Sequence, residues 1–203
     1  MNLIDVIMIT REEKMIENIT MKIINFSNKR EEDYEEYKLV EKAQGGCDES
    51  FEVLINLYKE YLYKMAFLHM KNEHDALDIY QETIYKAYIN IFKLRNPRFF
   101  KTWITKILIN NVNQKHRHDN KFKDEKVEDY IGEISYSSIE ENIDLYDAID
   151  SLEEKYKTSI ILQYFHDLNI SQISEIMECN ENTVKSYIRR AKKKLYDILK
   201  EDK

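Results

Sequence analysis

The sequence predicts an all-α protein made of two small helical domains. Three glycines and one proline in 203 residues are too few turn formers for a many-stranded sandwich or barrel. Hydrophobic residues make up 43% of the chain, which is enough to form a core and excludes wholesale disorder. Beyond about residue 37 these residues recur at three-to-four spacing, the period of amphipathic helices.

The first predicted domain is preceded by an extension. Residues 1–36 have no persistent hydrophobic period, so we expect them to be weakly ordered. Helical patterning begins near Tyr37, and Gly45 and Gly46 predict where the first helix ends. A second helix follows at once. Its expected buried face consists of Phe51, Leu54, Ile55, Leu57, Tyr58, Leu62 and Ala66.

Two more helices complete the first predicted domain, which covers residues 37–118. The third helix runs over residues 72–92, and a loop containing Pro97 leads to a fourth at about residues 100–115. The apolar stripe of the third helix consists of Ala76, Ile79, Tyr80, Thr83, Ile84, Ala87, Tyr88 and Ile91. Four helices with short connections predict one compact bundle.

A charged segment at residues 119–138 has little periodicity and is expected to be a flexible acidic linker. Helical patterning then resumes, so residues 139–203 form the second predicted domain. Asn169 and Asn180 are each expected to cap a helix, and the short turn between these helices predicts a helix-turn-helix. The residues expected to pack on this pair are Tyr156, Ile160, Ile161 and Phe165.

The net charge of −7 would argue against a nucleic-acid partner if the charges were evenly spread. Residues 31–90 carry 14 acids and 6 bases, whereas residues 92–118 carry 7 bases and no acid. Residues 139–181 carry 11 acids and 2 bases, whereas residues 182–203 carry 8 bases and 3 acids. A single basic run is often a solvated helix face. The repetition favours two separate phosphate-contacting surfaces.

The last basic run follows the predicted helix-turn-helix turn. Its inward face is set by Val184, Ile188, Ala191, Leu195 and Ile198. The other face offers polar side chains where a recognition helix meets base edges and phosphates. These side chains are Asn182, Thr183, Lys185, Ser186, Arg189, Arg190, Lys192 and Lys193. A basic, solvated terminal helix is the alternative, but it leaves unexplained why an acidic chain gathers its bases there.

The acid-free run at residues 92–118 interleaves its cations with Phe99, Phe100 and Trp103. Aromatic rings beside cations suit unpaired bases, which stack on the rings while the nucleic-acid backbone follows the charges. The alternative is that these rings are ordinary core. For Trp103, at helical spacing from Ile107, we expect a core position.

Other functional classes find little support. The five histidines show no HExxH spacing, no glycine loop suits a phosphate, and neither Cys47 nor Cys179 has a catalytic setting. We therefore expect no enzyme, no cofactor and no metal, and two isolated cysteines make no disulfide framework. No apolar run approaches the roughly 18 residues of a membrane helix. The charge order at the start inverts that of a signal peptide, so a cytoplasmic protein is expected.

Three sequence blocks carry a family resemblance. They are NEHDALDIYQETIYKAY at 72–88, FFKTWITKILINN at 99–111 and LNISQISEIMECNENTVKSYIRRAKKKL at 168–195. In order and spacing they resemble the extracytoplasmic-function (ECF) sigma factors, two-domain initiation subunits of bacterial RNA polymerase. The chain looks most like the lysozyme- and envelope-stress-responsive subgroup of low-GC Gram-positive bacteria. The resemblance implies a four-helix sigma2-type domain and a helix-turn-helix sigma4-type domain.

The resemblance also implies three binding surfaces. Docking on the clamp helices of the polymerase's largest subunit would use Asp75, Asp78, Gln81, Glu82 and Lys86. Capture of the separated minus-10 strand would use Lys93, Arg95, Asn96, Arg98, Lys106, Asn110, Asn113 and Arg117. Reading of the minus-35 element in the major groove would use Asn182, Thr183, Lys185, Ser186, Tyr187, Arg189, Arg190 and Lys192.

The chain departs from the family pattern at four positions. Gln114 stands where Asp is frequent, Ser174 where Ala packs closely, Glu178 where a turn glycine is common, and Tyr187 where Arg is frequent. A left-handed turn residue other than glycine costs free energy, and Tyr187 hints at a different minus-35 preference.

The partners implied by the resemblance are core RNA polymerase, promoter DNA and a membrane-anchored anti-sigma factor, with no small-molecule substrate. Two alternatives stay open. A stand-alone helix-turn-helix regulator, with a helical sensing or dimerisation domain, would bind its DNA without core polymerase. A purely structural helical protein would not need the segregation of charge.

Overall fold

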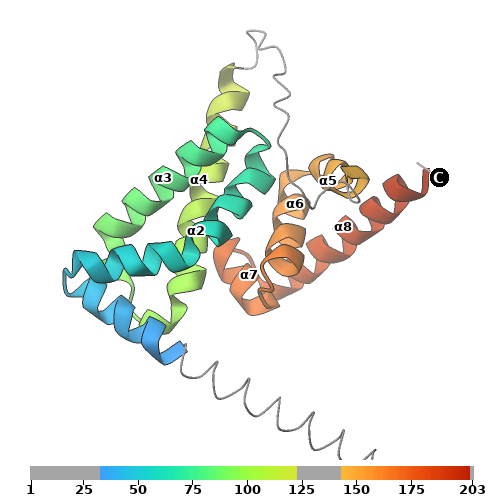
Figure 1. Ribbon diagram of the computed structural model, residues 1–203. Coiled ribbons are helices and arrows are strands. Elements are labelled where there is room, and N and C mark those ends of the chain that lie inside the picture. The colour runs from blue at the N-terminus through green and yellow to red at the C-terminus, as the bar shows by residue number, and fades with distance from the viewer. Residues whose placement is uncertain (1–32, 123–142, 202–203) are drawn as a thin grey trace, which may run out of the picture. The chain divides into compact units, whose positions relative to one another are not determined.

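The computed structural model describes residues 33–122 and 143–201, and every regular element in these ranges is helical (Figure 1). The predicted all-α class is therefore confirmed. Contacts between Cα atoms divide the chain into two compact units, Met1–Leu54 and Ile55–Lys203. The second unit includes both sides of the expected linker, because α4 (Phe100–Phe122) contacts α7 (Ile170–Ile176).

The first unit contains a helix at residues 33–44 and the start of α2 (Asp48–Met70). The helix ends at the predicted glycine pair, where Gly46 has a φ of 89° that glycine adopts without a Cβ clash. The Cys47 amide then donates to the Lys42 carbonyl at 3.1 Å. This bond satisfies a carbonyl group that the helix end would otherwise leave unpaired.

The second unit begins within α2 and continues into α3 (Glu73–Asn90) and α4, which pack side by side (Figure 1). Asn72 caps α3 by accepting the Asp75 amide at 3.0 Å. Two short 3-10 turns, Ile91–Lys93 and Pro97–Phe99, connect α3 to α4. The fully buried large side chains of this bundle include Leu62, Met65, Phe100, Ile104 and Leu108.

Two side chains that the spacing predicted as buried are exposed. Leu57 in α2 is 62% exposed and Tyr88 in α3 is 48% exposed. At 100° per residue, each lies roughly 120° from the centre of the buried face of its helix. Two apolar residues three or four positions apart lie close together on a helix. In a longer series of such steps, however, the later residues can lie on a different side of the helix from the first. The predicted stripes were therefore too wide.

The C-terminal elements are α5 (Ile143–Asp150), α6 (Glu154–Ile160), a π-helical turn (Ile161–Phe165), α7, and α8 (Glu181–Glu201). Helices α5, α6 and α7 all contact α8. Tyr156, Ile160 and Ile161 are buried as predicted, and Phe165 is half-buried beside Tyr146. The C-terminal core thus forms around the inward face of α8.

Both predicted caps of the helix-turn-helix are present. The Asn169 side chain accepts the Gln172 amide, and the Gln172 side chain accepts the Asn169 amide, each at 3.0 Å. The Asn180 side chain accepts the Thr183 amide at 2.8 Å. Between the helices Glu178 has a φ of 53°, the left-handed conformation expected for a residue at that turn. The local sequence therefore determines where α7 and α8 begin.

Some predicted boundaries differ from the observed helices. Residues 33–36, expected in the weakly ordered extension, are helical, and α4 continues to Phe122, beyond the predicted bundle. The other expectations for the extension and the linker lie outside the described residues. None of the described helices is both long and apolar enough to cross a bilayer.

Candidate nucleic-acid interfaces

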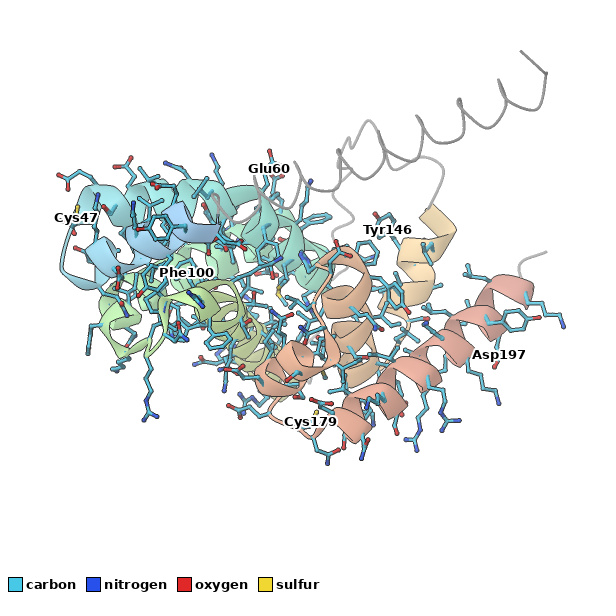
Figure 2. The ribbon with its side chains drawn as sticks, turned by 90° about the horizontal axis from the view of Figure 1, so that it is seen from below. Cys47, Glu60, Phe100, Tyr146, Cys179 and Asp197 are labelled. Carbon is cyan, nitrogen blue, oxygen red and sulfur yellow. The ribbon has the colours of Figure 1, made fainter. Side chains whose placement is uncertain are left out.

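Helix α8 presents a buried apolar face and an outer basic face. Val184, Ile188 and Ala191 are buried, whereas the next two predicted core residues, Leu195 and Ile198, are only half-buried. Long side chains project from α8 on the side away from α6 (Figure 2). The predicted contacts that are exposed are Asn182, Lys185, Arg189, Arg190 and Lys192, and those that are half-buried are Thr183, Ser186 and Tyr187. Seven of the eight lie on the outer surface of the helix or at its leading end, whereas Tyr187 lies at the edge nearest the buried face.

The leading end of α8 is ordered by its cap. Besides binding the Thr183 amide, the Asn180 carboxamide oxygen accepts the Thr183 hydroxyl at 3.0 Å. Lys185 lies 3.9 Å from Glu181 one turn earlier, and both side chains are more than half exposed. An exposed pair at this distance contributes little stability, so Lys185 can exchange Glu181 for a phosphate.

The second basic surface lies where α3 leads into α4. Lys93, Arg95, Asn96 and Arg98 are exposed on the connecting turns. Lys93 donates to the Asn90 side chain at 2.6 Å, and Asn96 accepts the Arg98 amide at 3.1 Å. Asn96 therefore also caps the turn that begins at Pro97. The cations of this segment all fall within residues 93–98.

The aromatic residues of this region divide into core and surface. Phe100 is fully buried and Trp103 is half-buried, so neither is freely available for stacking. Phe99 is 52% exposed. Phe92 is 66% exposed, with the Lys93 ammonium 5.6 Å from its ring centroid. The exposed rings beside cations are thus Phe92 and Phe99.

Helix α4 carries the other predicted minus-10 residues. Asn110 and Arg117 are exposed and Asn113 is half-buried. The Arg117 side chain donates to the Asn113 carbonyl at 3.1 Å. Lys106 forms a 3.0 Å ion pair with Glu178, so this predicted cation is neutralised by an acid of the same chain. The connecting turns carry further cations of this surface, Lys93, Arg95 and Arg98.

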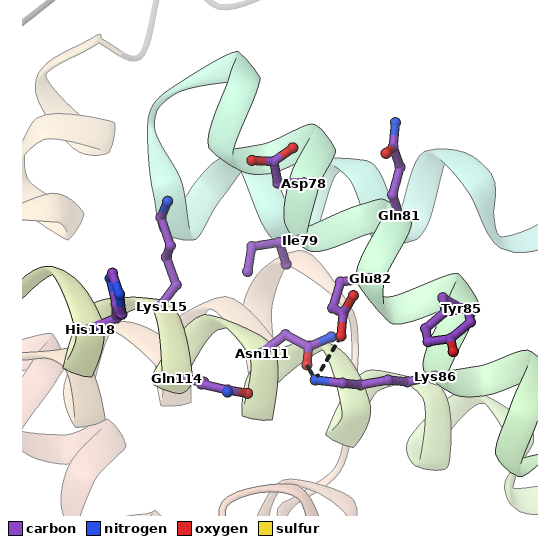
Figure 3. Close-up of a pocket in the computed structure, with 10 residues that line it drawn as sticks. All are labelled: Asp78, Ile79, Gln81, Glu82, Tyr85, Lys86, Asn111, Gln114, Lys115 and His118. Carbon is purple, nitrogen blue, oxygen red and sulfur yellow. Dashed lines mark hydrogen bonds and ion pairs between the residues drawn. The ribbon is translucent and has the colours of Figure 1, made fainter.

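Helix α3 presents the predicted acidic docking face. Asp78, Gln81 and Glu82 are exposed, and Asp75 pairs with Lys115 at 2.8 Å, which raises the pKa of that lysine. An open cavity of 640 Å³ lies between this face and α4 (Figure 3). Its lining residues are Asp78, Ile79, Gln81, Glu82, Tyr85, Lys86, Asn111, Gln114, Lys115 and His118.

Among the described residues, one group has the geometry to hold a cation. The ligand atoms of His74, Asp75 and Asp78 lie within 4.8 Å of one another. Asp75 is already paired with Lys115, and His74 lies 3.4 Å from Asp78. Because these groups satisfy one another on an exposed helix start, we assign no metal site.

Sequence reasoning missed an exposed apolar stripe that runs from the end of α3 into the turn Ile91–Lys93. Tyr85, Tyr88, Ile89 and Phe92 follow one another at i, i+3, i+4 and i+7, and each is at least 43% exposed. The spacing was visible in the sequence. Only Tyr88 was assigned to the predicted core, and the other three were not singled out, because spacing alone does not show which of two apolar stripes is buried.

Two family models match the chain. The model for Sigma-70 region 2 matches residues 54–122, which include the acidic helix and the first basic surface. The model for Sigma-70 region 4 matches residues 142–195, which include the helix-turn-helix. The second matched range begins after the predicted linker, and the first extends into its start, to residue 122.

Individual proteins agree with the family models. The RNA polymerase sigma factor SigV of Bacillus subtilis is 37% identical over 148 residues, which cover 71% of this chain and 89% of SigV. The ECF RNA polymerase sigma factor SigW of Bacillus subtilis is 29% identical, over 81% of this chain and 96% of SigW.

A solved structure has the same fold. The sigma factor RpoE from Bartonella quintana, crystallised with the anti-sigma factor NepR, matches with a TM-score of 0.65 and 23% identity, over 75% of this chain and 98% of RpoE. The solved structure supports the fold, and the family models and the relatives confirm the resemblance drawn from the sequence. The chain is thus a SigV-like member of the ECF sigma factors of the sigma-70 family, which are non-enzymatic transcription initiation factors.

Proposed function

We propose that the chain binds core RNA polymerase through α3, holds the minus-10 strand at the start of α4, and reads the minus-35 element with α8. One observation carries the proposal: an acidic chain with a net charge of −7 exposes two separate cationic surfaces. Arg95 and Arg98 mark the first surface, and Arg189 and Arg190 mark the second. Two exposed groups of cations on an acidic chain are what two contacts with one polyanion require.

Recognition of the minus-35 element is assigned to the outer face of α8. A helix that follows a short turn enters the major groove with its leading residues at the base edges. The cap at Asn180 orients this leading end, and the arginines further along can bind phosphates or guanine edges. We assign minus-35 contacts to Asn182, Thr183, Lys185, Ser186, Tyr187, Arg189, Arg190 and Lys192.

Capture of the minus-10 strand is assigned to the connecting turns and the outer side of α4. A base that leaves the duplex loses its stacking, and an exposed ring restores part of that energy. Phe92 and Phe99 supply such rings next to the cations of the loop. We assign backbone and base contacts to Lys93, Arg95, Asn96, Arg98, Lys106, Asn110, Asn113 and Arg117. For Lys106, binding requires that DNA replace Glu178 as its partner.

Polymerase docking is assigned to Asp75, Asp78, Gln81, Glu82 and Lys86. The exposed carboxylates of Asp78 and Glu82 suit a basic partner surface and would repel DNA. We place the domain boundaries at residues 37–118 and 139–203, with the linker between them. The observed helices extend the first domain at both ends, to residue 33 and to Phe122.

We further propose control by an anti-sigma factor, anchored at the membrane, in an envelope-stress response, with the chain itself in the cytoplasm. Support comes from the similarity to SigV and from the complex of RpoE with the anti-sigma factor NepR. Co-expression with candidate single-span membrane proteins should yield one that co-purifies with this chain and blocks its transcription. If none of the candidates inhibits transcription by this chain, control by a membrane-anchored anti-sigma factor is contradicted.

The test of the main proposal separates a polymerase subunit from a stand-alone regulator. A promoter fragment selected by the holoenzyme from randomised DNA is footprinted with the purified chain, with and without core polymerase. Protection only when core polymerase is present supports the proposal. Tight, sequence-specific protection by the chain alone would favour the regulator.

A further inference from the structure

We infer that Tyr156 is a positioning residue for minus-35 recognition: its ring and hydroxyl hold Tyr187 and Arg190 in place for DNA. The inference rests on the proposed role of α8. Tyr156 belongs to α6, outside the helix-turn-helix, and is only 5% exposed. It therefore acts on DNA through other side chains.

Tyr156 contacts two of the proposed DNA-binding residues at once. Its ring packs edge-on against the Tyr187 ring, with centroids 5.7 Å apart and planes at 74°. Its hydroxyl oxygen accepts a long hydrogen bond of 3.5 Å from the Arg190 guanidinium. Because Tyr187 and Arg190 are three residues apart, they lie on the same side of α8. One buried side chain thus supports two neighbouring positions of the reading face.

Two lysine ammonium groups lie close to the Tyr156 ring. The ammonium groups of Lys155 and Lys194 lie 5.0 Å and 4.9 Å from the ring centroid. Glu153 joins these two lysines, at 2.8 Å from Lys155 and 2.6 Å from Lys194. The cluster ties α6 to α8, since Glu153 and Lys194 are 41 residues apart in the chain.

Positioning of this kind has a physical reason. A long cationic side chain on an exposed helix samples many rotamers, and DNA binding must freeze one of them. The bond to Tyr156 holds the guanidinium while leaving most of its donors for a phosphate or a guanine. The same bond raises the pKa of Arg190, which shows that Tyr156 favours the charged guanidinium at this position. A role in core packing alone needs the ring of Tyr156 and not its hydroxyl.

The inference is tested by a double-mutant cycle on the full chain with core polymerase. The variants are Tyr156→Phe, Arg190→Ala and the double variant. The probes are promoter duplexes enriched from a randomised library, with the minus-35 element intact or scrambled. Tyr156→Phe keeps the ring, so the melting temperature should stay within a few degrees. We expect about three- to tenfold weaker binding of the intact duplex and no change on the scrambled one.

The cycle distinguishes positioning from packing. In the Arg190→Ala background, Tyr156→Phe should weaken binding far less than in the wild-type chain, because the residue that it positions is absent. Tyr196→Phe, a removal of an exposed hydroxyl from α8, is the matched control and should bind as wild type.

Two results would overturn the inference. Wild-type affinity of Tyr156→Phe, or an equal loss in both backgrounds, would show that the hydroxyl does not act through Arg190, while the minus-35 role of α8 would stand. Wild-type affinity of Arg190→Ala would instead remove Arg190 from the minus-35 site. The inference would then fail together with that part of the proposed function.

Discussion

Lys86 in α3 donates a 2.7 Å hydrogen bond to the side chain of Asn111 in α4 (Figure 3). Asn111 is 4% exposed and also donates to the Thr83 hydroxyl at 3.0 Å. Lys86 pairs on its other side with Glu82 at 3.1 Å. This network connects the helix assigned to polymerase docking with the helix assigned to the minus-10 strand. The network thus fixes the position of α3 against α4.

Asn111→Ala should destabilise the protein by about 1–3 kcal/mol, because it leaves a cavity and removes the partner of Lys86 and Thr83. Urea unfolding followed by circular dichroism measures this change. The neighbouring variant Asn110→Ala, on the exposed side of α4, should stay within about 0.5 kcal/mol of wild type. Equal stability of the two variants would contradict the buried network.

Charge reversal of the docking face should abolish polymerase binding. The double variant Asp78→Lys and Glu82→Lys reverses two exposed carboxylates, so it should keep its fold and lose co-purification with core polymerase. Glu60→Lys reverses an exposed charge on α2 and should still co-purify. Retention of polymerase by the double variant would move the docking site away from α3.

Removal of one phosphate-binding cation from α8 should flatten the salt dependence of promoter binding. For Lys185→Ala or Arg190→Ala we expect the slope of log affinity against log salt to fall by about 0.9 for each phosphate that the variant no longer neutralises. Fluorescence anisotropy of the holoenzyme on labelled promoter DNA at several salt concentrations measures the slope. Lys200→Ala, near the far end of α8, is the control. An unchanged slope in both variants would show that neither residue binds a phosphate.

The Glu153 cluster should make folding stability sensitive to acid. Hydrogen bonds from Lys155 and Lys194 lower the pKa of Glu153 from its ordinary 4.5 to about 2. The ionised form is thus favoured in the folded state. The contribution of Glu153 to the free energy of unfolding is present above about pH 4.5 and is lost as the pH falls toward 2.

Melting temperatures of wild type and Glu153→Gln should therefore differ at neutral pH and converge below pH 4.5. Because Glu153 is exposed, high salt should also reduce the difference. A difference that does not change with pH would show that the carboxylate charge is not the source of the effect.

Glu178→Gly should stabilise the protein by about 0.5–1 kcal/mol, because glycine adopts the left-handed conformation at little cost. Loss of the exposed pair with Lys106 offsets part of this gain. Glu175→Gly makes the same exchange inside α7 and should lower stability by a similar amount. Thermal unfolding compares the two variants, and destabilisation by Glu178→Gly would show that the ion pair outweighs the backbone strain.

Much of the fold and of the α8 surface could be predicted from the sequence, because both depend on residues close together in the chain. Asn169 and Asn180 cap the helices that they immediately precede, and Gly46 ends its helix through its own φ. The outer face of α8 follows from the angle between successive residues, once Val184 and Ile188 are placed inside. Exposed and buried aromatic residues were harder to tell apart, as Tyr88 and Phe100 illustrate.

Patterns along the chain were sufficient to predict the helices, their caps, the two basic surfaces and the family. The packing of the helices was needed to show which apolar stripe of α3 is buried, that Asn111 joins Lys86 across 25 residues, and that Tyr156 lies under Arg190 across 34 residues. This division arises because helical period and capping are local properties of the backbone. Contacts between distant residues form only when whole helices pack, and packing selects one of several faces that local patterns leave equivalent.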